Sequence, residues 1–131
     1  MSIATLTNMA DDPVTTVRRV FAAWTTGDAE TLRAIVDSRL VIESLLGVLY
    51  ERPTYRGREG LTEAFQETAG RWDQFEMRVE DARPAGERVI ARVHVVVGKH
   101  GMHSDTHLTV VCTLRSGLIV SVAGDVAQHA T

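Results

Sequence analysis

The residues best suited to acid–base chemistry stand two apart in a valine-rich stretch, as Arg92-Val93-His94. An imidazole titrates near neutrality, which makes His94 a candidate general acid or base. The fixed charge of a neighbouring guanidinium favours the neutral, proton-accepting form of the imidazole. Arg92 is also suited to holding an enolate or carboxylate oxygen of a ligand. The alternative is a structural role, with both side chains satisfied by Tyr, Glu or backbone partners.

A second polar group follows with the spacing His100-x-x-His103-x-Asp105-x-His107. All four side chains belong to the types that ligate transition metals. They fall in a glycine-containing segment that offers no cysteine and no rigid scaffold to fix a tetrahedral geometry. A solvated polar loop explains them more simply, so we expect no metal and no cofactor.

The composition is that of one globular domain. The chain has 131 residues, of which 44% are hydrophobic and 24% charged, with a net charge of −3. A nucleic-acid partner would require a basic stripe, and the sequence has no cluster of Lys and Arg, so we expect no such partner. The longest apolar run is far too short to cross a membrane, so we expect no membrane partner either. With one cysteine and no secretion signal, we expect a cytoplasmic protein with a flexible N-terminus over 1–11 and a single domain over 12–128.

Helix signals dominate the first half of the chain. Asp12-Pro13 and Asp28 are typical helix starts, and Gly27 between them is a typical stop, which predicts two tightly joined helices. Apolar residues at helical spacing predict a third helix over 58–72, in which Phe65 and Trp72 are expected to be core residues. A short strand over 40–44 and a long loop over 45–57 precede that helix.

Alternating apolar and polar residues in the second half predict four consecutive strands. Their expected ranges are 75–80, 89–97, 105–115 and 118–126. The order is therefore α-α-β-α-β-β-β-β, and the class is α+β, with three helices on one face of a mainly antiparallel sheet.

Four local phrases resemble the nuclear transport factor 2-like superfamily, in particular its SnoaL-like polyketide cyclase branch, which is related to ketosteroid isomerases. They are Val20-Phe21-Ala22-Ala23-Trp24 with Thr26-Gly27-Asp28, Tyr55-Arg56-Gly57-Arg58-Glu59-Gly60-Leu61, Ala85-Gly86-Glu87-Arg88-Val89, and Thr113-Leu114-Arg115-Ser116-Gly117-Leu118-Ile119-Val120. The resemblance implies a cone, in which a curved sheet wraps a long helix and leaves an apolar pocket open at one end. Because this superfamily includes enzymes and non-catalytic binders, the fold alone does not choose a function.

The resemblance also implies where reactive groups would stand, and most of those positions lack them. Its carboxylate, base and tyrosine positions fall on Val20, Ser44, Leu108, Val110 and Gly124. The family's inward-facing pair of polar residues matches Arg92 and His94, on the strand expected over 89–97. The resemblance therefore makes the face of Arg92 and His94 the pocket face.

The expected hairpin register extends this pocket face. A seven-residue loop over 98–104 pairs Val97 with Asp105 and sets His94 opposite Leu108. Val96, Leu108 and Val110 then face the ligand beside Arg92 and His94. The other substrate-binding residues that we expect are Trp24, Ser44, Tyr50 and Tyr55.

The opposite sheet face would carry Val93, Val95, Val97 and Val111, an apolar surface that a homodimer would cover. Two functions follow. One is an isomerase or cyclase acting on a hydrophobic carbonyl compound, with His94 as base and Arg92 as oxyanion stabiliser. The other is a non-catalytic or accessory protein that binds a small hydrophobic ligand on the same scaffold.

Overall fold

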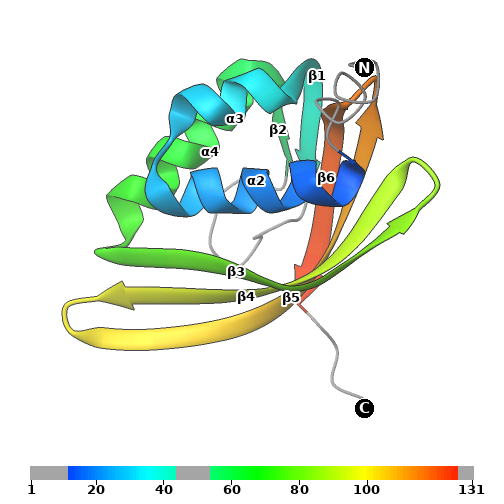
Figure 1. Cartoon of the computed structure of the whole chain (residues 1–131). Coiled ribbons are helices and arrows are strands. Elements are labelled where there is room, and N and C mark those ends of the chain that lie inside the picture. The colour runs from blue at the N-terminus through cyan, green and yellow to red at the C-terminus, as the bar shows by residue number, and fades with distance from the viewer. Residues whose placement is uncertain (1–11, 44–53, 127–131) are drawn as a thin grey trace, which may run out of the picture.

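A computed structural model, which describes residues 12–43 and 54–126, shows a curved sheet wrapped around one long helix (Figure 1). The α+β class, with its helices early in the chain and its sheet late, is as predicted. The elements are α2 (Pro13–Thr26), α3 (Ala29–Ile35), β1 (Val36–Glu43), β2 (Thr54–Arg56), α4 (Gly57–Arg71), β3 (Gln74–Ala85), β4 (Arg88–Lys99), β5 (Met102–Arg115) and β6 (Leu118–Val126).

The predicted helix starts are confirmed by their capping bonds. The Asp12 carboxylate accepts from the backbone N–H of Thr15 at 2.8 Å, and that of Asp28 accepts from Thr31 at 3.1 Å. Gly27 ends α2 in the left-handed conformation, with φ 79°, which costs glycine little. The third predicted helix, α4, begins and ends within one residue of its expected range.

The sheet has six strands in the order β2-β1-β6-β5-β4-β3. Among these strands, β1 and β6 pair in parallel and the other neighbours are antiparallel. The first strand is longer than the predicted 40–44. The sequence prediction missed β2, whose three residues are too few to show a period.

The register predicted for the β4–β5 hairpin is wrong. The turn consists of His100 and Gly101 alone, with φ 53° and 81°, the pair of left-handed residues typical of a type I′ turn. The strands continue through the expected seven-residue loop, so Lys99 pairs with Met102 and His94 with His107. This one-residue shift reverses which β5 residues share a face with which β4 residues, so His107 and not Leu108 lies on the face of His94.

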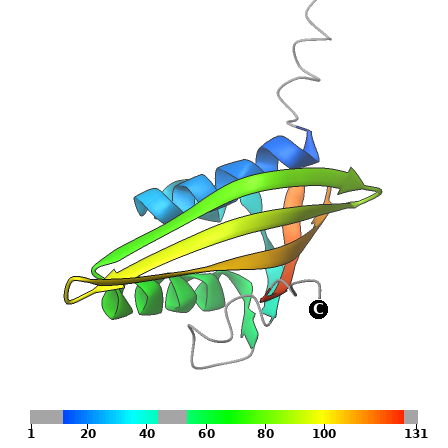
Figure 2. The ribbon, with the colours of Figure 1, turned by 90° about the horizontal axis from the view of Figure 1, so that it is seen from below.

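The three helices of the described residues lie on one side of the sheet, which we call the inner face. In Figure 2, which looks onto the other side, the outer face, α2 and α4 lie behind β3, β4 and β5. The buried hydrophobic residues of β4 are Val89, Ala91, Val93, Val95 and Val97, none more than 6% exposed. The inner face of the sheet therefore forms the hydrophobic core with α2 and α4.

Candidate functional site

A small cavity of about 20 Å³ lies between the helices and the inner face. Its lining comes from α2, β1, α4, β3 and β6 and consists of Val20, Phe21, Trp24, Val36, Leu40, Ile42, Leu61, Met77, Ile119 and Val122. None of these ten side chains is ionisable. A volume of this size has room for about one water molecule.

A larger hollow of about 400 Å³ lies at the C-terminal ends of α2 and α4. It is lined by Trp24, Thr25, Thr26, Gly27, Phe65, Thr68, Ala69, Trp72, Asp73, Gln74 and Phe75. Trp24 lines both the hollow and the inner cavity. Its ring meets that of Phe65 edge to face, with centroids 5.5 Å apart. The Trp24 indole is therefore the side chain that a ligand would have to pass or displace between the two spaces.

Two indole N–H groups at this hollow are buried without a hydrogen-bond acceptor. Neither Nε1 of Trp24 nor Nε1 of Trp72 has a partner in the part of the chain that the structure describes. A buried indole N–H usually finds an acceptor, because leaving the donor unpaired costs free energy. Two such donors in the lining of one hollow make it suited to a ligand with oxygen acceptors.

Hydrogen bonds fix the rim of the hollow to the sheet. Thr25 Oγ1 accepts from the backbone N–H of Met77 at 2.8 Å and donates to the Met77 carbonyl at 3.3 Å. Asp73 supplies the one carboxylate of the hollow's lining, and it accepts from the backbone N–H of His100 at 2.8 Å. The Asp73 carboxylate therefore has a structural task at the β4–β5 turn.

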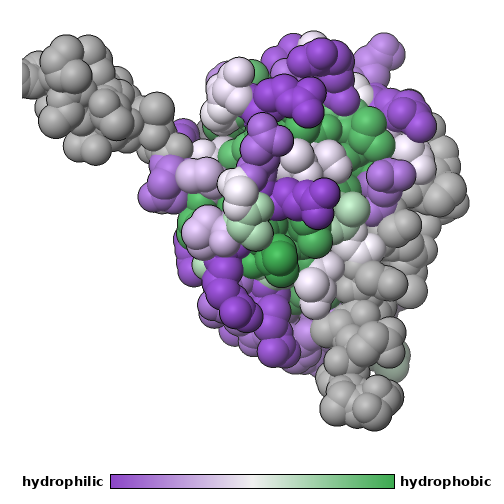
Figure 3. Space-filling view, turned by 90° about the vertical axis from the view of Figure 1, so that its right-hand side faces the viewer, coloured by the Kyte–Doolittle hydropathy of each residue, from purple (hydrophilic) through white to green (hydrophobic). Residues whose placement is uncertain are grey.

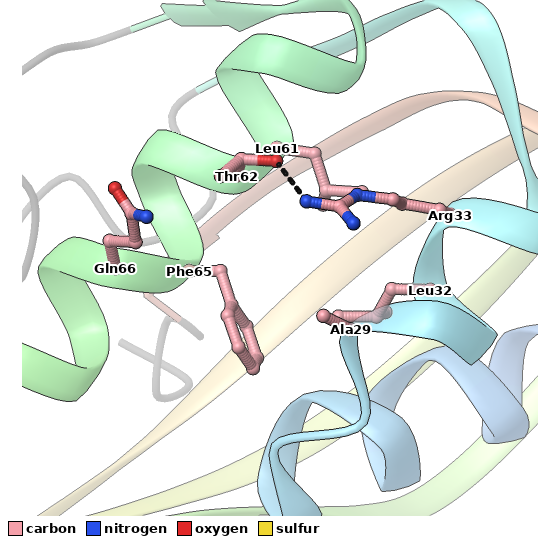
Figure 4. A pocket seen from close by; sticks show the side chains of 7 residues that line it. All are labelled: Ala29, Leu32, Arg33, Leu61, Thr62, Phe65 and Gln66. Atoms are coloured by element: carbon pink, nitrogen blue, oxygen red, sulfur yellow. Dashed lines mark hydrogen bonds between the residues drawn. The ribbon is translucent and has the colours of Figure 1, made fainter.

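A groove of about 230 Å³ between α3 and α4 adjoins the hollow (Figure 4). Phe65 contributes to the lining of both spaces. Arg33 closes part of the groove by donating to Thr62 Oγ1 at 3.2 Å, the bond drawn in Figure 4. Phe65 thus has open space on two sides, which leaves its ring room to move.

The structure places Arg92, His94 and Val96 on the outer face, and this corrects the predicted pocket face. They alternate along β4 with the buried inner residues, and His94 Nε2 lies 2.7 Å from Asp105 Oδ2. The catalytic role predicted for His94 and Arg92 required both side chains to lie in the cavity wall. The alternation of β4 places them on the outer face instead.

The other predicted ligand contacts are divided. Trp24 lines the cavity, and its contact with a ligand stays a prediction. Leu108 and Val110 are inward but fully packed, at 1% and 0% exposure. Tyr55 is not at a rim, since it is 2% exposed and donates to Glu67 Oε1 at 2.6 Å. Ser44 and Tyr50 lie outside the described residues.

The predicted dimer face combined residues from both sides of the sheet. Val93, Val95 and Val97 are inner residues, whereas Val111 is paired with Ile90 on the outer face. The expectation that Phe65 and Trp72 are plain core is also corrected, because both are half-buried and line the hollow. Their helical spacing alone did not distinguish a packed ring from one at an opening.

Residues 17–122 match the model of the SnoaL-like domain family. The chain belongs to this family. No curated protein matches the sequence. No helix among the described residues is long and apolar enough to cross a membrane.

Solved structures share the fold of this SnoaL-like domain. A loop-truncation variant of IdmH is 26% identical with a TM-score of 0.75, over 88% of this chain and 92% of that one. Wild-type IdmH from Streptomyces antibioticus, assigned as a polyketide cyclase, is 24% identical with a TM-score of 0.75, over 88% and 91%. A protein of ketosteroid isomerase-like fold from Catenulispora acidiphila, in complex with trimethylamine, is 17% identical with a TM-score of 0.72, over 83% and 82%.

Proposed function

We propose that this SnoaL-like domain binds a small, flat, largely apolar molecule that carries a carbonyl oxygen. The ligand would lie in the hollow against Phe65, Phe75 and Trp72 and reach the inner cavity at Trp24. The observation that carries the proposal is the pair of buried indole N–H groups that have no acceptor among the described residues. A carbonyl oxygen would satisfy one of these donors, while aromatic rings around it would contact the ligand's apolar surface.

The volumes favour the hollow as the main part of this site. Pockets for small molecules typically measure about 300–1,000 Å³. The hollow, at about 400 Å³, is in that range, whereas the inner cavity, at about 20 Å³, is not. A ligand that enters further must displace Trp24 or Phe65, and the groove beside Phe65 provides space for that movement.

Structures of the same fold support a small-molecule function. TerC, which is 14% identical with a TM-score of 0.76 over 87% of this chain and 90% of that one, was co-crystallised with polyporic acid. We therefore infer that this chain, which has the same fold, also binds a small hydrophobic ligand.

Between the two expected functions, the lining favours a binding or accessory protein over an isomerase or cyclase. Proton abstraction next to a carbonyl needs a base within hydrogen-bond reach of the substrate. In the linings described above, the carboxylate of Asp73 is the one candidate, and it is held by the His100 backbone. Binding needs no such group.

The proposal is tested with 1-tetralone, a flat aromatic ketone, and tetralin, the matching hydrocarbon without the oxygen. We expect the wild type to bind 1-tetralone more tightly than tetralin and Trp24→Phe to lose that preference, because the variant lacks the indole donor. His94→Gln is the matched control on the outer face and should bind both compounds as the wild type does. Equal affinity of the wild type for the two compounds, or no binding of either, would contradict the proposal.

The same ketone distinguishes binding from catalysis. Its acidic C–H beside the carbonyl exchanges with deuterium when a base removes the proton. We expect the exchange rate with the protein to equal that in buffer. A faster rate that His94→Gln abolishes would restore the enzymatic function predicted from the sequence.

We also propose a homodimer through the outer face, which now has a different composition from the one expected. By register, Val41, Ile90, Val111 and Ala123 lie on this face; Ile90 is 41% exposed and the other three are half-buried. Figure 3 shows hydrophobic residues at the centre of the side where β5 and β6 lie, surrounded by hydrophilic ones. Sedimentation should give twice the 14.4 kDa chain mass, and Ile90→Glu should give the monomer.

A further inference from the structure

We propose that the outer face of the sheet binds a transition-metal dication, Zn²⁺ in particular, through His94, His107 and Glu80, with Asp105 as the fourth ligand. The site is separate from the hollow and independent of the ligand proposed for it. Three neighbouring strands supply the side chains: β3 carries Glu80, β4 carries His94, and β5 carries His107 and Asp105.

The two histidines are directly opposite each other across the β4–β5 pair. Their rings stack with centroids 4.5 Å apart and planes 9° apart. One ligand atom from each of Glu80, His94 and His107 lies within 4.8 Å of the other two. Ligand atoms of a tetrahedral zinc ion stand about 3.4 Å apart, from bond lengths near 2.0–2.1 Å. Small side-chain rotations would therefore close the set around an ion.

Each imidazole already has a carboxylate beside its Nε2. Asp105 Oδ2 is 2.7 Å from that of His94, and Glu80 Oε2 is 3.5 Å from that of His107. Two imidazoles and two carboxylates form a donor set that zinc accepts, and the two negative charges balance the dication.

A strand irregularity brings Glu80 to this position. The β3–β4 register shifts between Val79 and Asp81, which leaves Glu80 as the extra residue of a bulge. Bulges re-aim side chains and are frequent beside functional sites. Arg78 pairs with His94 in the β3–β4 register, and its guanidinium is already engaged. It donates to both carboxylate oxygens of Glu76, at 2.8 and 3.1 Å. Arg78 is therefore not drawn to the carboxylate of Glu80.

The polar residues singled out in the sequence contribute only in part. Of the series His100, His103, Asp105 and His107, the last two join the cluster. His103 instead lies 2.8 Å from Gln74 Oε1, and His100 forms the turn. The decisive partner, His94, comes from the neighbouring strand, and sequence spacing does not reveal it.

The test is an isothermal titration calorimetry experiment in which ZnCl₂ is added to the metal-stripped full chain. We expect one Zn²⁺ per chain, with affinity reduced on the order of tenfold or more in both His94→Gln and Glu80→Gln. The matched controls are His103→Gln and Glu87→Gln, which remove the same groups outside the cluster and should bind Zn²⁺ as the wild type does. Glu80 is exposed, so Glu80→Gln should fold normally, and circular dichroism verifies this for each variant.

Two results would overturn the proposal. One is a wild type without saturable Zn²⁺ binding. The other is a loss in His103→Gln as large as that in His94→Gln, which would indicate adventitious binding by surface histidines. Because His94 lies on the face opposite the hollow, either result would leave the 1-tetralone comparison unaffected, and failure of that comparison would leave the zinc titration valid.

Discussion

The two faces of strand β4 have opposite character although their residues alternate in one stretch of sequence. The inner residues, from Val89 to Val97 in steps of two, are apolar and at most 6% exposed. The outer residues include Arg92 and His94, and His94 contacts its neighbour Asp105. In this strand, the two residues predicted to do chemistry both face away from the helices. The described part of the cone interior is a packed core, and the ligand contacts that we propose come from the helix ends.

The largest expected effect comes from placing a charge on the inner face. Val93→Asp would bury an unpaired carboxylate at a position with 0% exposure, so we expect loss of the folded state, a cost of several kcal/mol. Thr113→Asp is the matched change on the outer face, opposite Arg88 of β4 and Ser121 of β6 in the register, and should leave stability nearly unchanged. Thermal unfolding measures both. Equal effects of the two changes would contradict the face assignment.

A smaller effect is expected where the end of α2 is fixed to the sheet. Thr25→Val removes both hydrogen bonds to Met77 and leaves its N–H without that partner, a loss of about 1–3 kcal/mol. Thr26→Val, one residue further, removes only the hydrogen bonds from its hydroxyl to the Ala22 and Ala23 carbonyls of its own helix and should cost less. Urea unfolding distinguishes the two, and we also expect Thr25→Val to weaken 1-tetralone binding, because Thr25 lines the hollow.

Acid sensitivity should come from exposed carboxylates, not from the core. A backbone hydrogen bond from Thr15 chiefly lowers the pKa of Asp12, and the Thr31 hydroxyl chiefly lowers that of Asp28. A depressed folded-state pKa adds stability that is present above the unfolded value and is lost as the pH falls through the folded value. Asp28→Asn keeps a good cap, so stability at neutral pH should change little while its fall below pH 3.8 becomes shallower. A pH series of melting temperatures tests this.

The smallest effect is expected at the inner thiol. Burial raises the pKa of Cys112 to about 12, so the thiolate is scarce at neutral pH. A thiol reagent should label the folded wild type only as fast as it unfolds. Thr109→Cys in a Cys112→Ala background that also carries Ile90→Glu places the thiol on the outer face of the monomer and should react rapidly. Fast labelling of wild-type Cys112 would show that the inner face is open to solvent.

Local signals predicted the elements well. The Asp12-Pro13 start and the Gly27 stop are strong because capping is a short-range interaction. The Ser116-Gly117 turn was equally readable, and both its residues have positive φ. The His100-Gly101 turn has the same geometry, but it lies within a polar stretch that resembles a loop. Only the paired strands around it make it a two-residue turn.

The site was less predictable, because it depends on which face each strand turns to the helices. The pocket match implied by the resemblance placed His94 on the wrong side, and the one-residue register error grouped it with the inner residues Leu108 and Val110. The hollow combines the ends of α2 and α4 with the start of β3, and the chain separates Trp24 from Trp72 by 48 positions. No local pattern marks two indoles as neighbours of one opening.

The central claim, that a carbonyl ligand binds at the hollow through an indole N–H, is tested most directly by NMR of the two tryptophan side chains. The sequence contains two tryptophans, so their indole N–H signals are readily assigned with Trp24→Phe and Trp72→Phe. Addition of 1-tetralone should shift the Trp24 signal downfield as the bond forms, whereas tetralin should leave it without that shift. Equal shifts with both compounds, or shifts confined to the outer-face histidines, would contradict the account.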